Sequence, residues 1–288
     1  MITLVAIAAQ AERWVPRPVK FGLARLFGML VYWLVPRIRR NTTANMSVVL
    51  SLPPTDPRVR ALAMRSVVNY AEFTVDFLRT YRMTQEELLR HTVRIEGLQH
   101  LQAFKHMGRG GIMITAHFGN WDCCGSLVSV DQPTHVVAET FGSRSVTALL
   151  DDVRARKNLK TIQLGNAARG ILRTLRRGEF VALLADRPTP GKGVQVMFFD
   201  RPVWVPEGAA VLARHTGSPL LVGGMIRYHD GTYSAHGMPP ITIDRDRPAA
   251  EAVQEAMQQV MRDLETLIRK APAQWYMFRP MWPEALET

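Results

Sequence analysis

Short apolar runs alternate with amphipathic segments along most of the chain, from residue 91 to the C-terminal end. Apolar runs bounded by glycine or polar residues are typical of buried strands, and we predict strands at 93–95, 111–116, 135–138, 160–164, 180–185, 193–199, 220–228 and 232–236. Helical periodicity lies between them, at 121–130, 145–156, 167–177, 208–215 and 249–271. Strand–helix alternation of this kind predicts an α/β fold with a central, mostly parallel sheet flanked by helices.

The first 90 residues follow a helical pattern instead, and residues 58–81 carry a broad apolar face. Residues 21–35 are apolar except for Arg25 and two glycines. Because a spanning helix needs ~20 apolar residues, we expect this stretch to be an amphipathic helical element docked on a membrane surface. We therefore divide the chain into a membrane-associating helical region, 1–90, and an α/β core, 91–288, which together form one compact domain.

The charge distribution narrows the choice of partners. The formal net charge is +11, which indicates an anionic binding partner: nucleic acid, anionic lipid or an acidic carrier. Before residue 56 the only acid is Glu12, and the basic residues there are Arg13, Arg17, Lys20, Arg25, Arg37, Arg39 and Arg40. These charges flank an apolar stretch, so we expect an anionic membrane surface and no nucleic acid. We predict a peripheral protein on the cytoplasmic face of the cell (inner) membrane.

The composition is that of a folded protein with few cysteines. With 47% hydrophobic and 21% charged residues, the body of the chain is not disordered. The two cysteines, Cys123 and Cys124, are adjacent, which fits a reducing cytosol and disfavours a disulfide framework or a structural zinc site. Residues 1–11 lack the Lys/Arg start of a signal peptide, so we do not expect a cleaved signal.

The most informative segment is Ile114-Thr-Ala-His-Phe-Gly-Asn-Trp-Asp122. A buried strand ends here, and ligands of open α/β sheets bind beyond the carboxyl ends of strands, where His117 is placed. Asp122, in the first turn of the following helix, is close enough to orient the imidazole and leave its other nitrogen free to accept a proton. The alternative is a loop histidine beside an N-capping aspartate.

A second strand end carries an acid followed by an arginine, in Leu183-Leu-Ala-Asp-Arg-Pro188. Asp186 should reach the same sheet edge as His117, because reactive groups of parallel strands gather at their carboxyl ends. Asp186 alone, or Asp122 and Asp186 together, could then serve as the carboxylate partner of His117. The alternative is an acid that is solvated or paired with Arg187.

These segments, taken in order, resemble a known family. The run from His117 to Asp122 resembles the His-x4-Asp/Glu motif of lysophospholipid and glycerolipid acyltransferases. The wider pattern resembles one bacterial branch, the late acyltransferases of lipid A synthesis with the phosphatidylinositol mannoside acyltransferases. The matching segments are Arg39-Arg40-Asn41 with Asn45-Met46, Leu184-Ala-Asp-Arg187, Gly193-Val-Gln-Val-Met-Phe-Phe199, Ala213-Arg-His-Thr-Gly217 with Leu220-Leu-Val222, and Pro272-Ala-Gln-Trp-Tyr-Met-Phe-Arg279.

The resemblance implies an enzyme that transfers a fatty acyl group onto a lipid hydroxyl. In that family a histidine, here His117, acts as general base on the hydroxyl, which attacks an acyl thioester directly, without an acyl-enzyme, a metal or another cofactor. The implied donor is acyl-CoA or acyl carrier protein, and the implied acceptor is a membrane glycolipid or lysolipid. In the mannoside acyltransferases the supporting acid is the one before the arginine, here Asp186, although some members have glutamate there.

The resemblance and the neighbouring residues add weaker candidates for substrate binding, namely Asn120, Glu139, Arg154, Arg187 and Glu207. Glu139 and Arg154 follow the histidine at family-like spacings, but a strand-end acid and a helix-surface arginine would look the same. Glu207 lies in a Val-Pro-Glu-Gly segment that resembles the Phe-Pro-Glu-Gly block of glycerolipid acyltransferases, which helps to bind an acceptor phosphate region. A turn that caps the next helix is its alternative.

A row of arginines lies along the helix predicted at 167–177. Arg169, Arg173, Arg176 and Arg177 have the spacing i, i+4, i+7 and i+8, which places them on one helical face. Coenzyme A carries phosphates and acyl carrier protein is acidic, so this face could dock either donor. A solvated helix face is the alternative.

Two other classes of function stay possible. A metal-dependent hydrolase would use His117, Asp122 and Asp186 as ligands, but no second histidine or acid cluster has metal-site spacing, and we predict that no metal is needed. A non-catalytic membrane lipid-binding protein would share the basic, apolar N-terminal region without needing His117. The sequence leaves open the acceptor lipid, the acyl chain length, the type of donor and the oligomeric state.

Overall fold

A computed structural model of the chain describes residues 14–80, 82–130, 132–138, 148, 151–152 and 154–286. Seven strands form one sheet, in the order β1-β9-β8-β2-β5-β3-β4. Their bounds are β1 (Thr92–Glu96), β2 (Gly111–Thr115), β3 (Thr134–Ala138), β4 (Leu159–Gln163), β5 (Phe180–Leu184), β8 (Leu220–Arg227) and β9 (Tyr233–Gly237). Neighbours from β8 to β4 are parallel, and only β8 and β9 pair antiparallel. The predicted mostly parallel sheet is confirmed.

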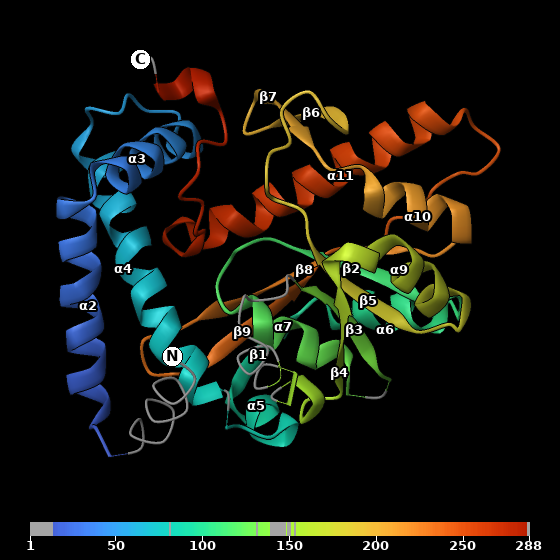
Figure 1. Cartoon of the computed structure of the whole chain (residues 1–288), viewed down its shortest axis with the longest axis horizontal. Coiled ribbons are helices and arrows are strands. Elements are labelled where there is room, and N and C mark those ends of the chain that lie inside the picture. The colour runs from blue at the N-terminus through green and yellow to red at the C-terminus, as the bar shows by residue number, and fades with distance from the viewer. Residues whose placement is uncertain are drawn as a thin grey trace.

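Helices cover both faces of this sheet (Figure 1). On β2, Ile112 and Ile114 belong to one apolar cluster and Met113 to another, as expected for a strand that is buried on both faces. The first face carries α9 (Ala167–Arg176), α10 (Gly208–Thr216) and α11 (Ala249–Lys270). The second face carries α5 (Gln85–His91), α6 (Leu98–His106) and α7 (Trp121–Val128).

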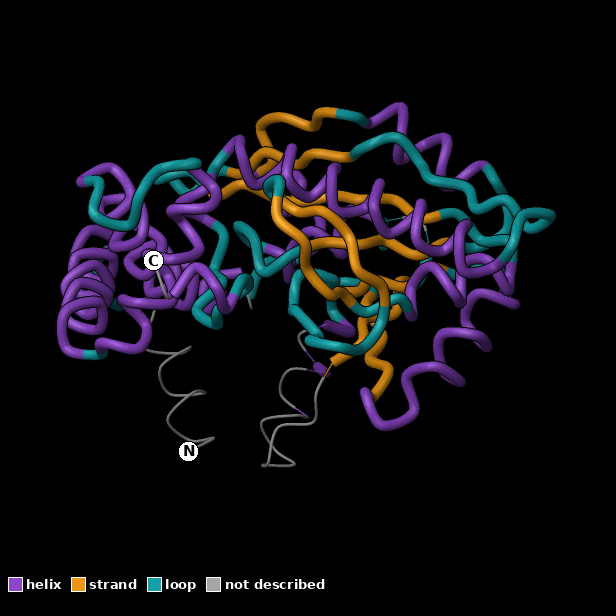
Figure 2. Tube along the Cα trace, turned by 90° about the horizontal axis from the view of Figure 1, so that it is seen from above, coloured by secondary structure: helices purple, strands orange, loops and turns teal. Residues whose placement is uncertain are grey.

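Three helices, α2 (Arg17–Leu34), α3 (Pro36–Leu50) and α4 (Pro57–Thr80), gather at one end of the molecule (Figure 2). The largest core cluster joins Met46 and Val67 of these helices to Ile114 of the sheet, so this end is packed onto the α/β body. Within the described chain, no single helix is long and apolar enough to cross a bilayer. The pair α2 and α3, bent by 94°, meets the length and composition criteria when the two are taken together. The expectations for residues 1–13, including Glu12 and Arg13, lie outside the described residues.

The strand predicted at 193–199 lies outside the central sheet. It forms β6 (Val194–Phe198), which pairs antiparallel with β7 (Arg201–Val205), a strand that the sequence interpretation missed. Phe199 and Asp200 connect the two with φ values of 50° and 58°, a turn conformation that is usually signalled by glycine or asparagine. Because the turn contains a phenylalanine and β7 contains a proline, the sequence pattern did not predict this hairpin.

Candidate active site

His117 and Asp186 emerge from neighbouring parallel strands at the same edge of the sheet. Thr115, the last residue of β2, is in register with Leu184, the last residue of β5. Each strand is followed by one alanine and then by the polar residue, so equal spacing carries both side chains to one point. The register of the sheet therefore brings His117 and Asp186 together, as the sequence at the two strand ends predicted.

The carboxylate of Asp186 is fully buried and receives three hydrogen bonds. Its Oδ1 lies 2.7 Å from Nδ1 of His117. Its Oδ2 accepts from the backbone N–H of His117 at 2.9 Å and from the indole Nε1 of Trp275 at 3.0 Å. With Nδ1 directed at a carboxylate, the neutral imidazole carries its proton there and presents Nε2 as the base.

The electrostatics keep this carboxylate ionised. Burial alone would raise the pKa of Asp186, but the charge that His117 can carry and the hydrogen bonds from His117 and Trp275 outweigh it, so the pKa lies below its usual value. The His117 side chain is 16% exposed, so its ring reaches the surface from a buried support. A buried anion behind a partly exposed imidazole can stabilise the positive charge that the ring gains on accepting a proton.

Asp122 takes a different position from the one its spacing to His117 suggested. It lies 3.9 Å from Nη2 of Arg154 and, with Arg154 and Trp121, lines a cavity of ≈ 70 Å³. Burial raises the pKa of Asp122 despite the nearby Arg154. Among the described residues it has no hydrogen bond to the imidazole, which Asp186 holds through Nδ1. The geometry thus gives the partner position to Asp186 and places Asp122 beside it as a pocket residue.

The C-terminal segment is hydrogen-bonded to the loop that carries His117. The backbone N–H of Tyr276 donates to the carbonyl of His117 at 2.8 Å, and that of Gly119 donates to the carbonyl of Gln274 at 2.9 Å. Gly119 has φ +57°, and a Cβ on it would lie 1.8 Å from the carbonyl oxygen of Met225, so only glycine fits. Trp275 belongs to a segment that the sequence analysis matched to the family, but its place against Asp186 was missed because the contact joins distant parts of the chain.

Asn120 makes hydrogen bonds within the protein, and its role in substrate binding stays a prediction. It is fully buried, its Nδ2 donates to Oδ2 of Asp76 at 3.0 Å, and its Oδ1 accepts from the N–H of Cys123 at 3.2 Å. Asp76 also accepts from the hydroxyl of Tyr233 at 2.6 Å. The sequence reasoning overlooked Asp76, although an acid inside the apolar face of a helix was the available signal.

The other predicted substrate-binding residues lie at separate places in the structure. Arg187 is exposed directly after Asp186, and Glu207 is exposed at the start of α10, where its side chain makes no capping hydrogen bond. Glu139 lies outside the residues that the structure describes. A role in substrate binding therefore stays a prediction for Arg187 and Glu207, whereas Arg154 has a defined place beside Asp122.

The four arginines predicted on one face of α9 do line one surface hollow, of ≈ 420 Å³. Arg177 pairs with Glu179 at 3.0 Å. Over the described part of the chain, Arg169, Arg173 and Arg176 have no acidic partner within ion-pair distance. Within the described ranges, these three arginines therefore form a row of positive charge without an acidic partner.

A second basic hollow, of ≈ 760 Å³, lies where α2 turns into α3. It is lined by Arg39, Arg40 and Arg60 together with Tyr32 and Trp33. The adjacent face of α2 is apolar and open to solvent, with the exposed side chains Leu23, Leu26, Phe27, Leu30, Trp33 and Leu34. Apolar surface and positive charge are therefore contiguous at this end of the molecule.

Two of the basic residues expected to flank the apolar stretch, Arg17 and Arg25, bind other parts of the protein. Nε of Arg25 lies 2.6 Å from Oε1 of the buried Glu72, and Arg17 donates to the carbonyls of His229 and Asp230. A contact of these two residues with an anionic membrane surface stays a prediction.

In the described ranges, no three His, Cys, Asp or Glu side chains are grouped so that they could hold a metal ion. His117, Asp122 and Asp186 therefore do not form the ligand set that the hydrolase interpretation requires.

Comparison with known proteins identifies the family of this chain. The sequence matches the bacterial lipid A biosynthesis acyltransferase family over residues 1–284. A phosphatidylinositol mannoside acyltransferase of Mycobacterium tuberculosis (strain CDC 1551 / Oshkosh) is 29% identical over 247 residues, covering 83% of this chain and 75% of the relative. The enzyme of the same name from Mycolicibacterium smegmatis is 28% identical over 244 residues, covering 83% and 77%. The lipid A biosynthesis palmitoleoyltransferase of Escherichia coli (strain K12) is 26% identical over 183 residues, covering 63% and 58%. The chain belongs to the bacterial lipid A biosynthesis acyltransferase family and is an acyltransferase.

Proposed function

We propose that this enzyme transfers a fatty acyl group from a thioester donor to a hydroxyl of a membrane glycolipid or lysolipid, with His117 as general base. The observation that supports this most is the bond between Nδ1 of His117 and the buried carboxylate of Asp186, at the sheet edge where α/β enzymes bind ligands. Similarity to phosphatidylinositol mannoside acyltransferases and to a lipid A biosynthesis palmitoleoyltransferase favours a glycolipid acceptor.

The proposed reaction needs no covalent intermediate on the protein. Nε2 of His117 takes the proton of the acceptor hydroxyl while its oxygen attacks the thioester carbonyl. Asp186 remains ionised and stabilises the imidazolium through Nδ1. When the tetrahedral intermediate collapses, the C–S bond breaks and the imidazolium returns its proton to the leaving thiolate. No resident metal or other cofactor is proposed, because the histidine base and the thioester leaving group supply the chemistry.

The acceptor reaches the site from a membrane surface in this proposal. The exposed apolar face of α2 would enter the interface, and Arg39, Arg40 and Arg60 would meet anionic headgroups. We place the protein peripherally on the cytoplasmic side of the cell (inner) membrane, where thioester donors are made.

The donor is acyl-CoA or acyl carrier protein, and the arginine row of α9 is its proposed docking surface. The helix covers the β3, β4 and β5 half of the sheet and begins at the edge where β4 ends, the edge that also carries His117. Arg169, Arg173 and Arg176 are spread along two turns, which suits a donor with several negative charges better than a single phosphate.

Mass spectrometry of lipids tests the proposal. Purified protein is incubated with an isotopically labelled long-chain acyl-CoA, or the same acyl group on a carrier protein, and a mixed bacterial lipid extract. The expected product is a glycolipid that has gained the labelled acyl group, in EDTA as in buffer, and His117→Ala should not form it. Labelled free fatty acid as the only product, lost in EDTA and restored by a divalent ion, would indicate the hydrolase. Lipid binding without any labelled product would indicate a non-catalytic binding protein.

A further inference from the structure

Two buried carboxylates on α4 are connected to the loop that carries His117. Glu72 and Asp76 are 1% and 0% exposed, and their i, i+4 spacing places them one turn apart on one face of the helix. Glu72 lies 2.7 Å from Nη2 of the buried Arg227, and Asp76 lies 3.0 Å from Nη2 of Arg79. Buried ion pairs are weak sources of stability, because the cost of desolvation offsets their attraction. Stability alone is therefore a poor explanation for two buried acids on this helix.

Asp76 binds the side chain of Asn120, which follows the histidine by three residues. Oδ2 of Asp76 accepts from Nδ2 of Asn120 at 3.0 Å, and Oδ1 of Asn120 accepts from the backbone N–H of Cys123 at 3.2 Å, at the start of α7. An ionised carboxylate only accepts hydrogen bonds, so Asp76 selects the amide orientation in which Oδ1 faces the first turn of the helix. The acid thereby fixes the N-cap of α7 and the end of the loop.

Glu72 reaches the same loop by a longer route. Its Oε2 accepts from Nη2 of Arg227 at 2.7 Å. The side chain of Gln274 bonds both the backbone N–H and the carbonyl of Arg227, at 3.0 and 2.8 Å. The carbonyl of Gln274 in turn accepts from the N–H of Gly119 at 2.9 Å. The helix therefore supports the loop at Gly119 through this chain, next to the residue that Asp76 binds.

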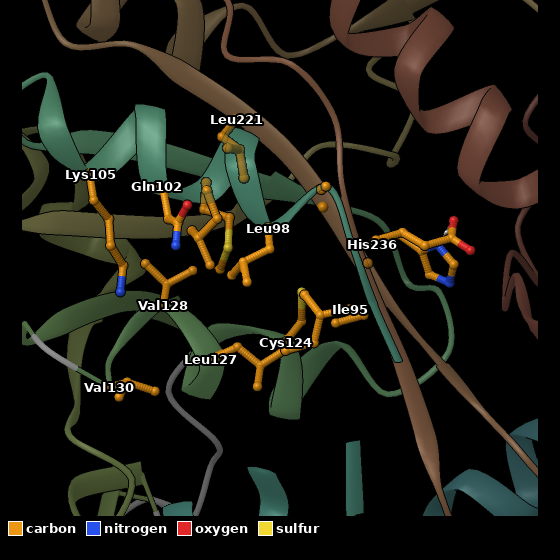
Figure 3. Close-up of a pocket in the computed structure, with 18 of the residues that line it drawn as sticks. Ile95, Leu98, Gln102, Lys105, Cys124, Leu127, Val128, Val130, Leu221 and His236 are labelled. Atoms are coloured by element: carbon orange, nitrogen blue, oxygen red, sulfur yellow. Dashed lines mark hydrogen bonds and ion pairs between the residues drawn. The ribbon is translucent and has the colours of Figure 1, made fainter. Parts of the chain in front are cut away.

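Packing fixes α7 only in part. A cavity of ≈ 510 Å³ lies between α6, α7 and the sheet, and Cys124, Leu127 and Val128 of α7 line it (Figure 3). Close packing normally holds a helix in place, so this open space leaves α7 with fewer contacts on that side. The position of its first turn, and of His117 before it, then depends more on the polar contacts of Asn120.

We propose that Asp76 is a positioning residue for acyl transfer: through the amide of Asn120, it holds the loop from which His117 directs Nε2 at the acceptor hydroxyl. This inference rests on the proposed function, because it takes His117 as the general base. Asp186 holds the imidazole through Nδ1, and Asp76 holds the backbone from which that ring extends. A displacement of ~1 Å at the reacting atoms can lower a rate ~10²-fold, so a residue that acts only on the loop can have a large effect on kcat.

Exchanging the two side chains tests the proposal. Asp76→Asn brings two amides together and Asn120→Asp brings two carboxylates together, whereas the double exchange restores an amide that donates to a carboxylate. Each single variant should lower kcat ~10–10²-fold with little change in the KM for the donor, and the double exchange should recover kcat to within ~5-fold of wild type. Steady-state rates of labelled acyl transfer are measured at a temperature where circular dichroism shows that every variant is folded.

Dependence on His117 separates positioning from a purely structural role. In the His117→Ala background, Asp76→Asn should lower the residual rate less than ~2-fold, because no imidazole is left to be misplaced. The control is Asp263→Asn, the same change at a buried acid on α11 whose hydrogen bond is to Gln259 of that helix. It should leave kcat unchanged whether or not it lowers the melting temperature.

Asn120→Ala is the second variant, and it decides the question if Asp76→Asn does not fold. This change removes the amide and leaves Asp76 bonded to Arg79 and Tyr233. A loss of kcat of ~10-fold or more is expected again, and it should again be absent in the His117→Ala background.

Three results would overturn the proposal. One is a wild-type kcat in folded Asp76→Asn or Asn120→Ala, and another is an equal loss of rate with and without His117. The third is a double-exchange variant that folds but recovers none of the lost kcat. A wild-type rate in His117→Ala would instead defeat the proposed function, so the two failures are distinguishable.

Discussion

Two carboxylates lie near His117, and they occupy different environments. Asp186 follows the neighbouring strand β5, is fully buried and receives its hydrogen bonds from His117 and Trp275. Asp122 is only five residues from His117 in sequence, yet it lies on α7 and faces Arg154 at 3.9 Å. The pKa of Asp186 is lowered by its partners, whereas burial raises that of Asp122.

The contrast shows that proximity in sequence is a poor guide to pairing at a sheet edge. A residue in the first turn of a helix is carried away from the strand that precedes it, whereas equivalent positions after two paired parallel strands come together. We therefore expect the two acids to respond very differently to the same substitution, and the histidine to be affected most.

The largest effect is expected for His117→Ala. Removing the general base should lower kcat ~10²–10⁴-fold with the fold intact, because proton removal from the acceptor hydroxyl loses its acceptor. The measurement is the initial rate of labelled acyl transfer, with circular dichroism as a check on folding. His215→Ala, an exposed histidine on α10, is the matched control and should keep the wild-type rate. More than a tenth of the wild-type rate in His117→Ala would remove His117 from the mechanism.

Asp186→Asn should come next, with kcat lowered ~10²-fold or more and little change in the KM for the donor. The amide keeps a hydrogen-bonding group but loses the charge that stabilises the imidazolium. Asp122→Asn, the matched change on α7, should lower kcat less than ~10-fold, because Asp122 acts on the pocket and on Arg154. The opposite ranking of the two variants would give the partner role to Asp122.

Membrane binding should depend on the exposed face of α2. Replacing Phe27, Leu30 and Trp33 with serine should weaken co-sedimentation with anionic vesicles even at low salt, because these side chains would enter the interface. High salt should release much of the wild-type protein, since each basic residue near the surface contributes ~1 kcal/mol. Serine at Val93, Met197 and Val211, which are exposed elsewhere, is the control. Wild-type protein that resists both salt and carbonate would indicate a segment that crosses the bilayer.

The smallest effect is expected on α9. Glutamine at Arg169, Arg173 and Arg176 should raise the KM for the donor several-fold and leave kcat unchanged, because this row lies away from the reacting atoms. Glutamine at Arg65, Arg90 and Arg201 removes the same charge elsewhere and is the control. An equal change in both triple variants would show that only net charge matters and that the row is a solvated helix face.

The sequence predicted the parts of the molecule that depend on local pattern. The buried strand before His117 and the apolar strand before Asp186 were visible as runs of residues, and the parallel alternation brought their ends together. What it could not predict were contacts between distant segments, such as Trp275 on Asp186 and Gln274 on Gly119. The same holds for the ion pair between Arg25 and Glu72, because Glu72 lies on another helix.

The central claim is that Asp186 acts through His117, and a double-mutant cycle tests it most directly. Initial rates of labelled acyl transfer are measured for wild type, His117→Ala, Asp186→Asn and the double variant at saturating donor. If the two residues work as a unit, Asp186→Asn lowers the rate ~10²-fold in wild type but less than ~2-fold in the His117→Ala background. An equal loss in both backgrounds would show that Asp186 acts independently of the histidine, and it would contradict the proposed dyad.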